Sequence, residues 1–418
     1  MGVTPSPRRS RRLLILGLNY RPEEIGIGPY TAGLAEELVR RGHRVDVIAG
    51  QPYYPQWRAL EGYSGWTTRE ENGVSVHRCP HYVPSDPTGA RRIAHHASFA
   101  ASTLLCAVRA AKRLAPDCVL AVAPSLLAVP VAARAAKAAG APLWLHVQDF
   151  EVEAAIATGL IGGVGSAARA ARRFESAMLA RADRISTISP QMCALLQDRG
   201  IVPERIVELR NWANHAGAVE AAAGARLRRE WGLEDKTVAL YSGNIANKQG
   251  LEIAIEAARL LASRDDLAFL ICGNGPNRRR LEAMAHGLSN VRFEDLQPAS
   301  RVGELLAMAD VHLLPQLAGA ADLVLPSKLG NMLASGRPVV ATAEAGTGLA
   351  HEVEGCGLTV PPGDAQAFAG AIAQLADDPG LRARLGEAGQ ARARERWTLD
   401  GVADCFEAAL EKLLAGPR

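Results

Sequence analysis

Short apolar runs alternate with longer helical stretches along almost the whole of this 418-residue chain. The helical stretches place apolar residues on one face, as in Tyr30–Arg41, where Leu34, Ala35 and Leu38 lie together. Such alternation predicts parallel sheets covered by helices, because parallel strands need a long crossover between them. The chain is also too long for one ordinary core. We therefore expect an α/β fold of two doubly wound, Rossmann-like domains that face a cleft.

The expected strands form two series, separated by a linker at Asn211–Asn214. The first series comprises Leu13–Gly17, Arg44–Ala49, Val74–Arg78, Cys118–Ala123, Leu143–Val147, Arg184–Thr187 and Ile206–Leu209. The second comprises Val238–Tyr241, Leu267–Ile271, Val291–Glu294, Val311–Leu314, Val339–Ala341 and Leu358–Val360. Helices are expected between the later strands at Leu251–Ser263, Arg278–His286, Arg301–Met308 and Ala365–Ala376. Ligands of such sheets bind beyond the carboxyl ends of the strands, so the loops there are the candidate sites.

These series predict four segments of chain. Residues 1–12 form a disordered leader, 13–210 an N-terminal domain, 211–392 a C-terminal domain, and 393–418 a helix that packs across the domain seam. The last helix is indicated by Trp397, Phe406 and Leu410 at helical spacing.

Composition limits the class of protein. Hydrophobic residues make up 48% and charged residues 22% of the chain, which is typical of a globular protein, and a net charge of +3 does not indicate a nucleic-acid partner. The seven cysteines include no C-x-x-C pair, which favours reduced thiols in the cytoplasm over disulfides or a zinc site. The basic N-terminus precedes an apolar run of only Leu13–Leu18, too short for a signal peptide. Prolines 124 and 130 interrupt the most apolar stretch, so we expect no transmembrane segment.

The most specific motif is the segment Leu325–Val340, which predicts a turn, a short helix, a glycine stop and a strand. At the start of that helix, Pro326, Ser327 and Lys328 offer backbone N–H groups, a hydroxyl and an ammonium, a combination that suits a diphosphate. The same Pro-Ser pair is also an ordinary helix start signal.

Two more loops follow strands in this half. Ser242–Gly250 contains Gly243, Asn244 and Lys248, and its small residues let a ligand approach the backbone. In the second loop, Gly273 and Gly275 form a turn on which a nucleoside base could rest. The alternative for Lys248 is an ordinary solvated surface lysine.

Lys248 and Lys328 lie in separate loops of the same predicted domain, and both can reach one diphosphate. A departing diphosphate develops negative charge that must be compensated, and the sequence shows no metal-ligand cluster to do this. One donor aimed at such charge is worth about 3 kcal/mol. We therefore expect catalysis by Lys248 and Lys328 with no metal and no cofactor.

The N-terminal half contributes three weaker candidates. Gly26 and Gly28 precede a helix that starts with proline, which leaves backbone N–H groups open to a ligand, although glycine can simply shape a loop. The pattern is not G-x-G-x-x-G, so dinucleotide binding is disfavoured. His146 and Asp149 end a strand and are candidates for catalytic or acceptor contacts, or for a structural cap. The arginine-flanked stretch Arg91–Leu114 predicts either contact with an anionic membrane or an ordinary solvated helix.

The chain resembles the retaining nucleotide-sugar glycosyltransferases of family 4, which have the GT-B architecture, and within them the colanic-acid-type exopolysaccharide enzymes. The resemblance covers nearly the whole chain and is carried by "HVQDF", "YSGNIANKQGLEIAIEAA", "ICGNGP" and "DLVLPSKLGNMLASGRPVVATA". It implies a hexosyltransferase whose N-terminal domain faces the acceptor and whose C-terminal domain binds the donor. It also implies that Lys248 and Ser327–Leu329 hold the donor diphosphate, which Gly26 and Gly28 approach from the other domain.

The sequence departs from the family pattern at two places. The arginine that usually precedes the motif lysine is missing, with Asn244–Asn247 in that region, and the usual acidic pair is absent. Asn331 stands where many members carry the second glutamate of an E-x7-E motif, and the first position is Leu323, beside Asp322. Asn331 can still hydrogen-bond a ribose. The resemblance further implies attack on the same face as the departing diphosphate, no metal, and an acceptor that is a glycan or a lipid-linked saccharide at the cytoplasmic membrane face. Two other functions remain open: a nucleotide-sugar epimerase of the same architecture, and a catalytically silent nucleotide-sugar-binding protein.

Overall fold

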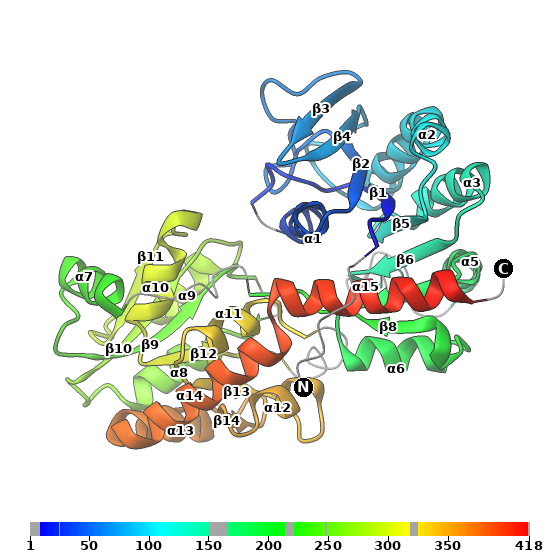
Figure 1. Cartoon of the computed structure of the whole chain (residues 1–418). Coiled ribbons are helices and arrows are strands. Elements are labelled where there is room, and N and C mark those ends of the chain that lie inside the picture. Colours follow the sequence, from blue (N-terminus) through cyan, green and yellow to red (C-terminus); the bar gives the residue numbers. More distant parts are fainter. Residues whose placement is uncertain are drawn as a thin grey trace, which may run out of the picture. The chain divides into compact units, whose positions relative to one another are not determined.

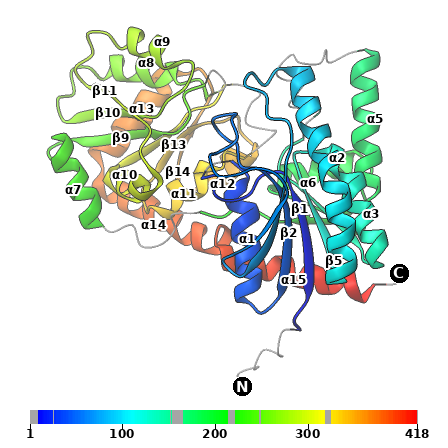
Figure 2. The same ribbon diagram turned by 90° about the horizontal axis from the view of Figure 1, so that it is seen from above.

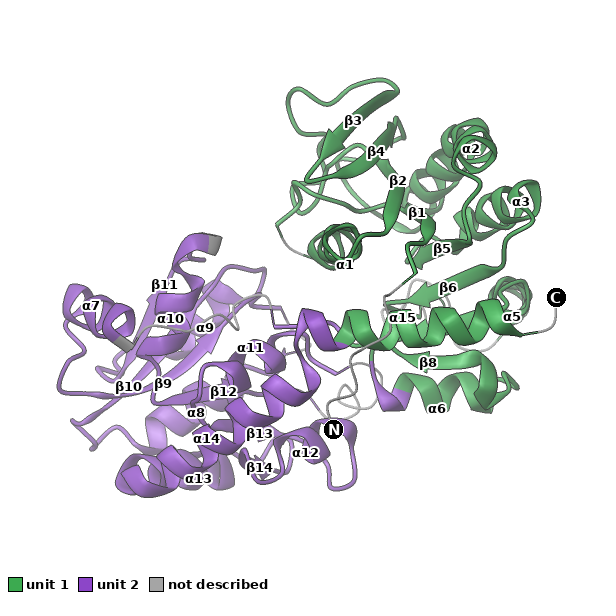
Figure 3. Ribbon diagram, in the orientation of Figure 1, with its two compact units in different colours: residues 1–188, 192–210, 402–418 green, residues 189–191, 211–401 purple. Residues whose placement is uncertain are grey.

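The computed structural model describes residues 9–24, 26–150, 152, 165–213, 221–246, 249–317 and 325–416. The chain divides into two compact units, which Figure 3 colours separately. Unit 1 comprises residues 1–188, 192–210 and 402–418, and unit 2 comprises residues 189–191 and 211–401. The main change from one unit to the other falls between Arg210 and Asn211.

Unit 1 is built on an 8-stranded sheet in the order β3-β4-β2-β1-β5-β6-β7-β8. The strands are β1 (Arg12–Gly17), β2 (Arg44–Gly50), β3 (Thr67–Glu71), β4 (Val74–Cys79), β5 (Cys118–Ala123), β6 (Leu143–Val147), β7 (Arg184–Thr187) and β8 (Ile206–Glu208). All the predicted strands of this half form, and they pair in parallel. The sequence did not predict β3, which pairs antiparallel to β4 at the sheet edge. Its residues are polar and largely exposed, so they show no apolar alternation.

Helices cover both faces of this sheet. Those of unit 1 are α1 (Gly28–Arg40), α2 (Gly89–Leu114), α3 (Val129–Ala139), α5 (Ser166–Ala180), most of α6 (Pro190–Asp198) and most of α15 (Leu399–Ala415). Figures 1 and 2 show α1 on one face, and α2 beside α3 on the other. As predicted, α1 buries Leu34, Ala35 and Leu38.

The described part of the chain includes the last residues of the predicted leader, which ends at residue 12. Residues 1–8 lie outside the described residues, but Arg12 opens β1 and pairs with Arg44. The guanidinium of Arg11 donates to both carboxylate oxygens of Glu411, over 2.8 and 2.6 Å. Strand pairing and this bidentate ion pair hold two residues that composition alone assigned to a disordered tail.

The predicted helix at 393–418 is two helices. α14 (Pro379–Arg396) ends before Trp397, whose carbonyl accepts a hydrogen bond from the backbone N–H of Ala213 over 2.9 Å. The hydroxyl of Thr398 then accepts from the N–H of Gly401 over 3.2 Å, as a residue that caps a helix start does. α15 follows, and its residues from 402 onward belong to unit 1.

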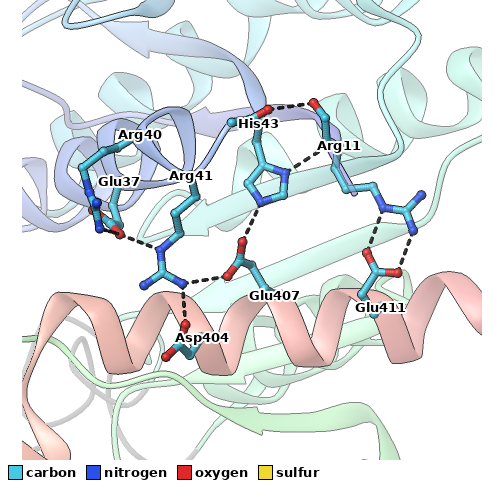
Figure 4. A network of polar contacts seen from close by, with 10 residues as sticks. Arg11, Glu37, Arg40, Arg41, His43, Asp404, Glu407 and Glu411 are labelled. Atoms are coloured by element: carbon cyan, nitrogen blue, oxygen red, sulfur yellow. Dashed lines mark hydrogen bonds and ion pairs between the residues drawn. The ribbon is translucent and has the colours of Figure 1, made fainter. Parts of the chain in front are cut away.

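A network of ion pairs fixes α15 within unit 1 (Figure 4). Arg41, which is only 6% exposed, contacts Glu37 over 2.5 Å, Asp404 over 2.5 Å and Glu407 over 2.7 Å. The other oxygen of Glu407 lies 2.8 Å from Nε2 of His43. The carboxylates of Glu37 and Glu407 thus share a largely buried site with the guanidinium of Arg41, which ties α15 to the end of α1, whereas the third carboxylate, Asp404, is 57% exposed.

Unit 2 is built on a 6-stranded parallel sheet in the order β11-β10-β9-β12-β13-β14. The strands are β9 (Thr237–Ser242), β10 (Leu267–Cys272), β11 (Val291–Glu294), β12 (Val311–Leu314), β13 (Val339–Thr342) and β14 (Gly357–Val360). The helices are α7 (Ala221–Trp231), α8 (Glu252–Leu260), α9 (Arg278–Met284), α10 (Val302–Met308), α11 (Lys328–Ala334), α12 (Gly348–Val353), α13 (Ala365–Asp377) and α14. These strands match the sequence prediction within two residues at each end.

Alternate side chains of β9 enter two separate cores. Val238 and Leu240 pack with residues of α7 and α10, whereas Ala239 and Tyr241 pack with residues of α8 and α13. Burial on both faces explains why this strand is a continuous apolar run rather than an alternating one.

Candidate functional site at the carboxyl edge of unit 2

The strand order of unit 2 reverses beside β9. β10 pairs with one edge of β9 and β12 with the other, so the loops that follow β9 and β12 diverge at this point. In open α/β sheets, this topological switch point is where ligands bind. The loop after β9 contains Gly243 and Asn244, and the chain beyond β12 leads to Ser327 and Lys328 at the start of α11. The structure therefore brings two of the predicted motifs to one edge of one sheet.

Lys328 is held by Tyr241, the aromatic residue of β9. Its ammonium donates a hydrogen bond to the hydroxyl of Tyr241 over 2.9 Å and lies 4.0 Å from the centre of that ring. The Tyr241 hydroxyl donates in turn to the carbonyl of Asn244 over 2.6 Å. Burial raises the pKa of Tyr241, so the hydroxyl remains protonated and acts as a fixed dipole. The result is a half-buried ammonium with a defined position.

Gly243 lies directly beneath this ammonium. A Cβ at residue 243 would lie 3.2 Å from Nζ of Lys328, and the glycine has φ +134°, a conformation that side chains disfavour. The missing side chain therefore keeps the backbone open next to the positive charge. An anion that approached Gly243 would meet Lys328 at once.

The remaining residues of the motif have distinct environments. Ser327 is exposed and its side chain makes no cap hydrogen bond to α11, so the hydroxyl points to no backbone partner there. Leu329 is fully buried and its N–H donates to the carbonyl of Pro326 over 3.0 Å, which makes it an anchor for the segment. Asn331 is half-buried on α11.

Residues 273 and 275 must be glycine because neighbouring backbone atoms leave no room for a side chain, which the sequence did not show. A Cβ at Gly273 would lie 1.9 Å from the carbonyl oxygen of Gly243, and one at Gly275 would lie 2.2 Å from that of Ile245. The backbone N–H of Ile245 donates to the backbone carbonyl of Asn274 over 2.9 Å, so a hydrogen bond joins the loop after β9 to the loop after β10. These two glycines therefore shape the loop after β9, whether or not a nucleoside base also rests there.

Arg278 completes this arrangement and was missed by the sequence analysis. Its Nη1 donates to the carbonyl of Gly273 over 3.0 Å and to the side-chain oxygen of Asn274 over 2.6 Å. The hydrogen bond and charge of Glu282 raise the pKa of Arg278, which stays protonated. Its place directly after the glycine turn, at the first position of α9, was the available signal.

Several predicted residues lie outside the described residues. These are Lys248, Asp322, Leu323 and the chain that follows Asp149 at 151 and 153–164. The convergence of Lys248 and Lys328 on one diphosphate therefore stays a prediction.

In unit 1 the Gly26 and Gly28 loop encloses a buried carboxylate. Glu23 is 2% exposed and accepts hydrogen bonds from the backbone N–H groups of Tyr53 and Tyr54 over 3.0 and 3.1 Å. Gly26, with φ +77°, packs against the ring of Tyr54, and Gly28 packs against Glu23 itself. Burial raises the pKa of Glu23. Both glycines thus have close neighbours that a side chain would meet, which the sequence alone could not show.

His146 is tightly held at the end of β6. Its Nε2 accepts from the amide of Gln148 over 2.9 Å, which leaves the proton on Nδ1, and this nitrogen donates to Ser186 over 2.8 Å. Burial lowers the pKa of His146 to about 4, so the ring is neutral at physiological pH. Both nitrogens are thus occupied within unit 1, which favours the structural interpretation over a catalytic one. Asp149 is half-buried directly beyond this strand.

Across the described ranges, no three His, Cys, Asp or Glu side chains come together in a way that could hold a metal ion. Two cationic groups lie among the described loops at the carboxyl edge of unit 2: the ammonium of Lys328 beside Gly243, and the guanidinium of Arg278 beside Gly273 and Asn274.

Comparisons with known proteins identify the family. A family model described as a glycosyl transferase 4-like domain matches residues 26–212, and one described as glycosyl transferases group 1 matches residues 225–392. Over 375 residues the chain is 42% identical to an Escherichia coli (strain K12) protein that carries the name colanic acid biosynthesis glycosyl transferase WcaI, which covers 87% of this chain and 91% of that relative. This chain belongs to the family 4 glycosyltransferases.

Solved structures show the fold of this glycosyltransferase. Anabaena HepE in complex with UDP superposes with a TM-score of 0.70 at 17% identity, covering 96% of this chain and all 100% of that one. Sucrose-phosphate synthase from Thermosynechococcus elongatus gives a TM-score of 0.74 at 19% identity, covering 97% and 99% of the two chains. The predicted GT-B fold class is therefore confirmed, and so is the prediction of an enzyme.

Proposed function

We propose that this glycosyltransferase moves a hexose from a nucleoside diphosphate sugar to a glycan or lipid-linked saccharide in cell-surface polysaccharide synthesis, with retention of anomeric configuration. The observation that carries the proposal is the ammonium of Lys328, fixed by Tyr241 beside the open backbone of Gly243. A cation held there can neutralise a diphosphate without moving during the reaction, which is how preorganised charge lowers a barrier. The WcaI name of the Escherichia coli relative supports the polysaccharide context.

The proposed reaction breaks the bond between the anomeric carbon and the diphosphate oxygen, and forms a bond from that carbon to an acceptor hydroxyl oxygen. The hydroxyl proton passes to the departing diphosphate on the same face of the sugar. Lys328 and Lys248 compensate the negative charge that develops, and Ser327 and Asn331 supply polar contacts to the donor. This route requires no side-chain base, which agrees with a His146 that is neutral and has both nitrogens occupied.

The donor class is supported by the structural neighbours. HepE has been crystallised in complex with UDP and in complex with UDP and glucose. The likeness in fold makes a nucleoside diphosphate sugar the natural donor for this enzyme too.

We further propose peripheral contact with an anionic membrane on the cytoplasmic side, through α2. None of the helices formed by the described residues has the length and hydropathy needed to cross a bilayer. α2 contains basic residues in its first and last turns and no acidic residue anywhere. A lipid-linked acceptor would be reached most readily by an enzyme that lies on the surface of the membrane.

A donor screen tests the proposal. The purified enzyme is incubated with UDP-, GDP- and dTDP-sugars and a lipid extract, and the product is analysed by NMR for the configuration of the new linkage. Transfer with retention from one donor is expected. Tight nucleotide-sugar binding without turnover would identify a silent binding protein, free epimerised donor would identify an epimerase, and an inverted linkage would contradict the mechanism.

A further inference from the structure

One face of α2 exposes large apolar side chains to solvent. Ile93 is 63% and Leu105 is 67% exposed, and both lie on a stripe of exposed positions spaced four residues apart. The stripe comprises Ile93, Ala97, Ala101, Leu105, Arg109 and Arg113. The opposite face of the same helix is packed, with Phe99 and Thr103 fully buried. A helix that covers its sheet with one face and exposes isoleucine and leucine on the other has an unused apolar surface.

Two exposed aromatic residues extend this apolar surface along one flank of the helix, where Ser98 and Ser102 lie one turn apart. The indole N–H of Trp66 donates to the carbonyl of Ser102 over 3.3 Å, while 66% of the residue remains exposed. The backbone N–H of Tyr82 donates to the hydroxyl of Ser98 over 2.8 Å, and Tyr82 is 47% exposed. Exposed Trp and Tyr beside aliphatic residues are typical of surfaces that enter the boundary between lipid headgroups and acyl chains.

The charge of this helix has one sign. α2 has no Asp or Glu in its 26 residues. Arg91 is paired with Asp86 over 3.2 Å and Arg113 with the buried Asp46 over 2.6 Å. Arg109 and Lys112 are exposed and enter no ion pair within the part of the chain that the structure describes. Two uncompensated cations thus remain near the carboxyl end of the helix.

A groove joins the apolar and cationic parts of this surface. It has a volume of about 420 Å³, with Trp66 and Leu105 among its walls, Ala101 and Ser102 along the helix, and Arg109 and Arg113 at one end. A phospholipid presents the same combination, a phosphate followed by an acyl chain. We propose that this groove and the exposed stripe of α2 dock on an anionic phospholipid bilayer, with a headgroup phosphate at Arg109 and acyl carbons between Trp66 and Leu105.

This inference deepens the proposed peripheral membrane contact and rests on it, and it narrows the contact from the whole predicted stretch Arg91–Leu114 to the carboxyl half of α2. Arg91, at the amino end, already has Asp86 as a partner, and the exposed Arg92 beside it does not line the groove. Glu71 of the neighbouring β3 is likewise neutralised by Arg78 over 3.0 Å. The binding energy is therefore expected to come from the carboxyl half of the helix, where apolar contact and free positive charge coincide.

Vesicle co-sedimentation of the full chain tests the proposal. The wild type should bind vesicles that contain phosphatidylglycerol and not vesicles of pure phosphatidylcholine, and added salt should weaken binding. Because each basic residue near an anionic surface contributes about 1 kcal/mol, R109E/K112E should weaken binding at least about tenfold. The control R229E/R384E reverses two exposed arginines of unit 2, changes net charge equally and should bind as wild type.

The apolar half of the proposal needs its own variant. Leu105→Glu should weaken binding to a similar extent, whereas Leu260→Glu, at an exposed leucine of α8 that is 50% accessible, should not. Wild-type binding by either R109E/K112E or Leu105→Glu would overturn the proposal, as would competition by glycerol phosphate, which would indicate a site for a free phosphate ester. Thermal shift with UDP, GDP and dTDP on the same samples keeps the outcomes separate, because lost lipid binding with intact nucleotide binding contradicts only this inference.

Discussion

The ammonium of Lys328 donates to the Tyr241 hydroxyl over 2.9 Å while it lies 4.0 Å from the centre of the same ring. One side chain thus fixes the cation in two ways, by a hydrogen bond at its tip and by the negative face of its π-system. The ring is itself part of the core between the sheet and α8, so the position of the charge is set by the packing of unit 2.

Lys328→Ala should reduce sugar transfer by roughly 100-fold or more, because it removes a preorganised donor at the developing charge. The matched control is Lys236→Ala, at a half-buried lysine of the same unit that donates to the carbonyl of Asp265. Initial rates at saturating donor, with circular dichroism as a check on the fold, measure the effect. Unchanged turnover in Lys328→Ala would remove the diphosphate role.

Tyr241→Phe should reduce kcat about tenfold, since the ammonium keeps the ring beneath it but loses the acceptor that orients it. If Tyr241 acts only through Lys328, the same substitution made in Lys328→Ala should cause no further loss of turnover. This double-mutant cycle separates positioning from a general loss of stability. Additive effects on kcat would show that Tyr241 does not work through the lysine.

Gly273→Ala should destabilise unit 2 by about 3 kcal/mol or more, since its Cβ would lie 1.9 Å from the carbonyl oxygen of Gly243 at φ +154°. Gly287→Ala is the control: that glycine also has a positive φ, +85°, but nothing lies within 4 Å of the added carbon. The control should cost only about 1 kcal/mol. Urea unfolding measures both, and equal losses would show that backbone strain, and not the contact between loops, explains the glycine.

The fold was predictable because most of its strands are buried on both faces, the exceptions being β3, β8, β11 and β14. Strands buried on both faces appear in the sequence as continuous apolar runs, and the glycines and prolines that separate them mark the loops. β3 lacks that signal, because its side chains are polar and it forms only by pairing with β4. The sequence also did not predict the break between α14 and α15, because Trp397 has helical spacing with its neighbours. In the structure the carbonyl of Trp397 accepts a hydrogen bond from the backbone N–H of Ala213 between the two helices.

The candidate site was predictable only in part. Lys328 and Gly243 were recognisable from the residue types in their loops, and the parallel sheet brings those loops together. Tyr241 and Arg278 were not, because their roles depend on partners that only the tertiary structure supplies. The same holds for Glu23, whose buried carboxylate has backbone partners some 30 residues away in the sequence.

Acid should destabilise the enzyme between about pH 6.5 and pH 4. Burial lowers the pKa values of His81, His95 and His96 to about 4, as it does for His146. The unfolded chain, with histidine pKa values near 6.5, binds more protons in this interval, so the free energy of unfolding falls as pH is lowered through it and is fully retained above it.

Unfolding free energies measured in urea from pH 7.5 to pH 4 should therefore show a steep decline. His146→Gln removes one titrating group from unit 1 and should flatten that slope, whatever its effect on stability at pH 7.5. A slope equal to that of the wild type would mean that His146 is not held neutral by the fold.

Arg41→Ala should destabilise unit 1 by about 3 kcal/mol, because it leaves the buried carboxylate of Glu407 with only His43 and takes one of two guanidinium partners from Glu37, which keeps Arg40. Asp404, the third partner of Arg41, is 57% exposed, so Asp404→Ala should cost less than about 1 kcal/mol.

The indole of Trp144 stacks on Phe406 of α15 with ring centres 4.8 Å apart, so a change in tryptophan fluorescence on urea unfolding is expected to report the release of this helix. Adding Glu407→Gln to Arg41→Ala should recover part of the loss by removing one unpaired charge. If Arg41→Ala and Asp404→Ala proved equally mild, α15 would be held by apolar packing and not by the buried ion pairs of Figure 4.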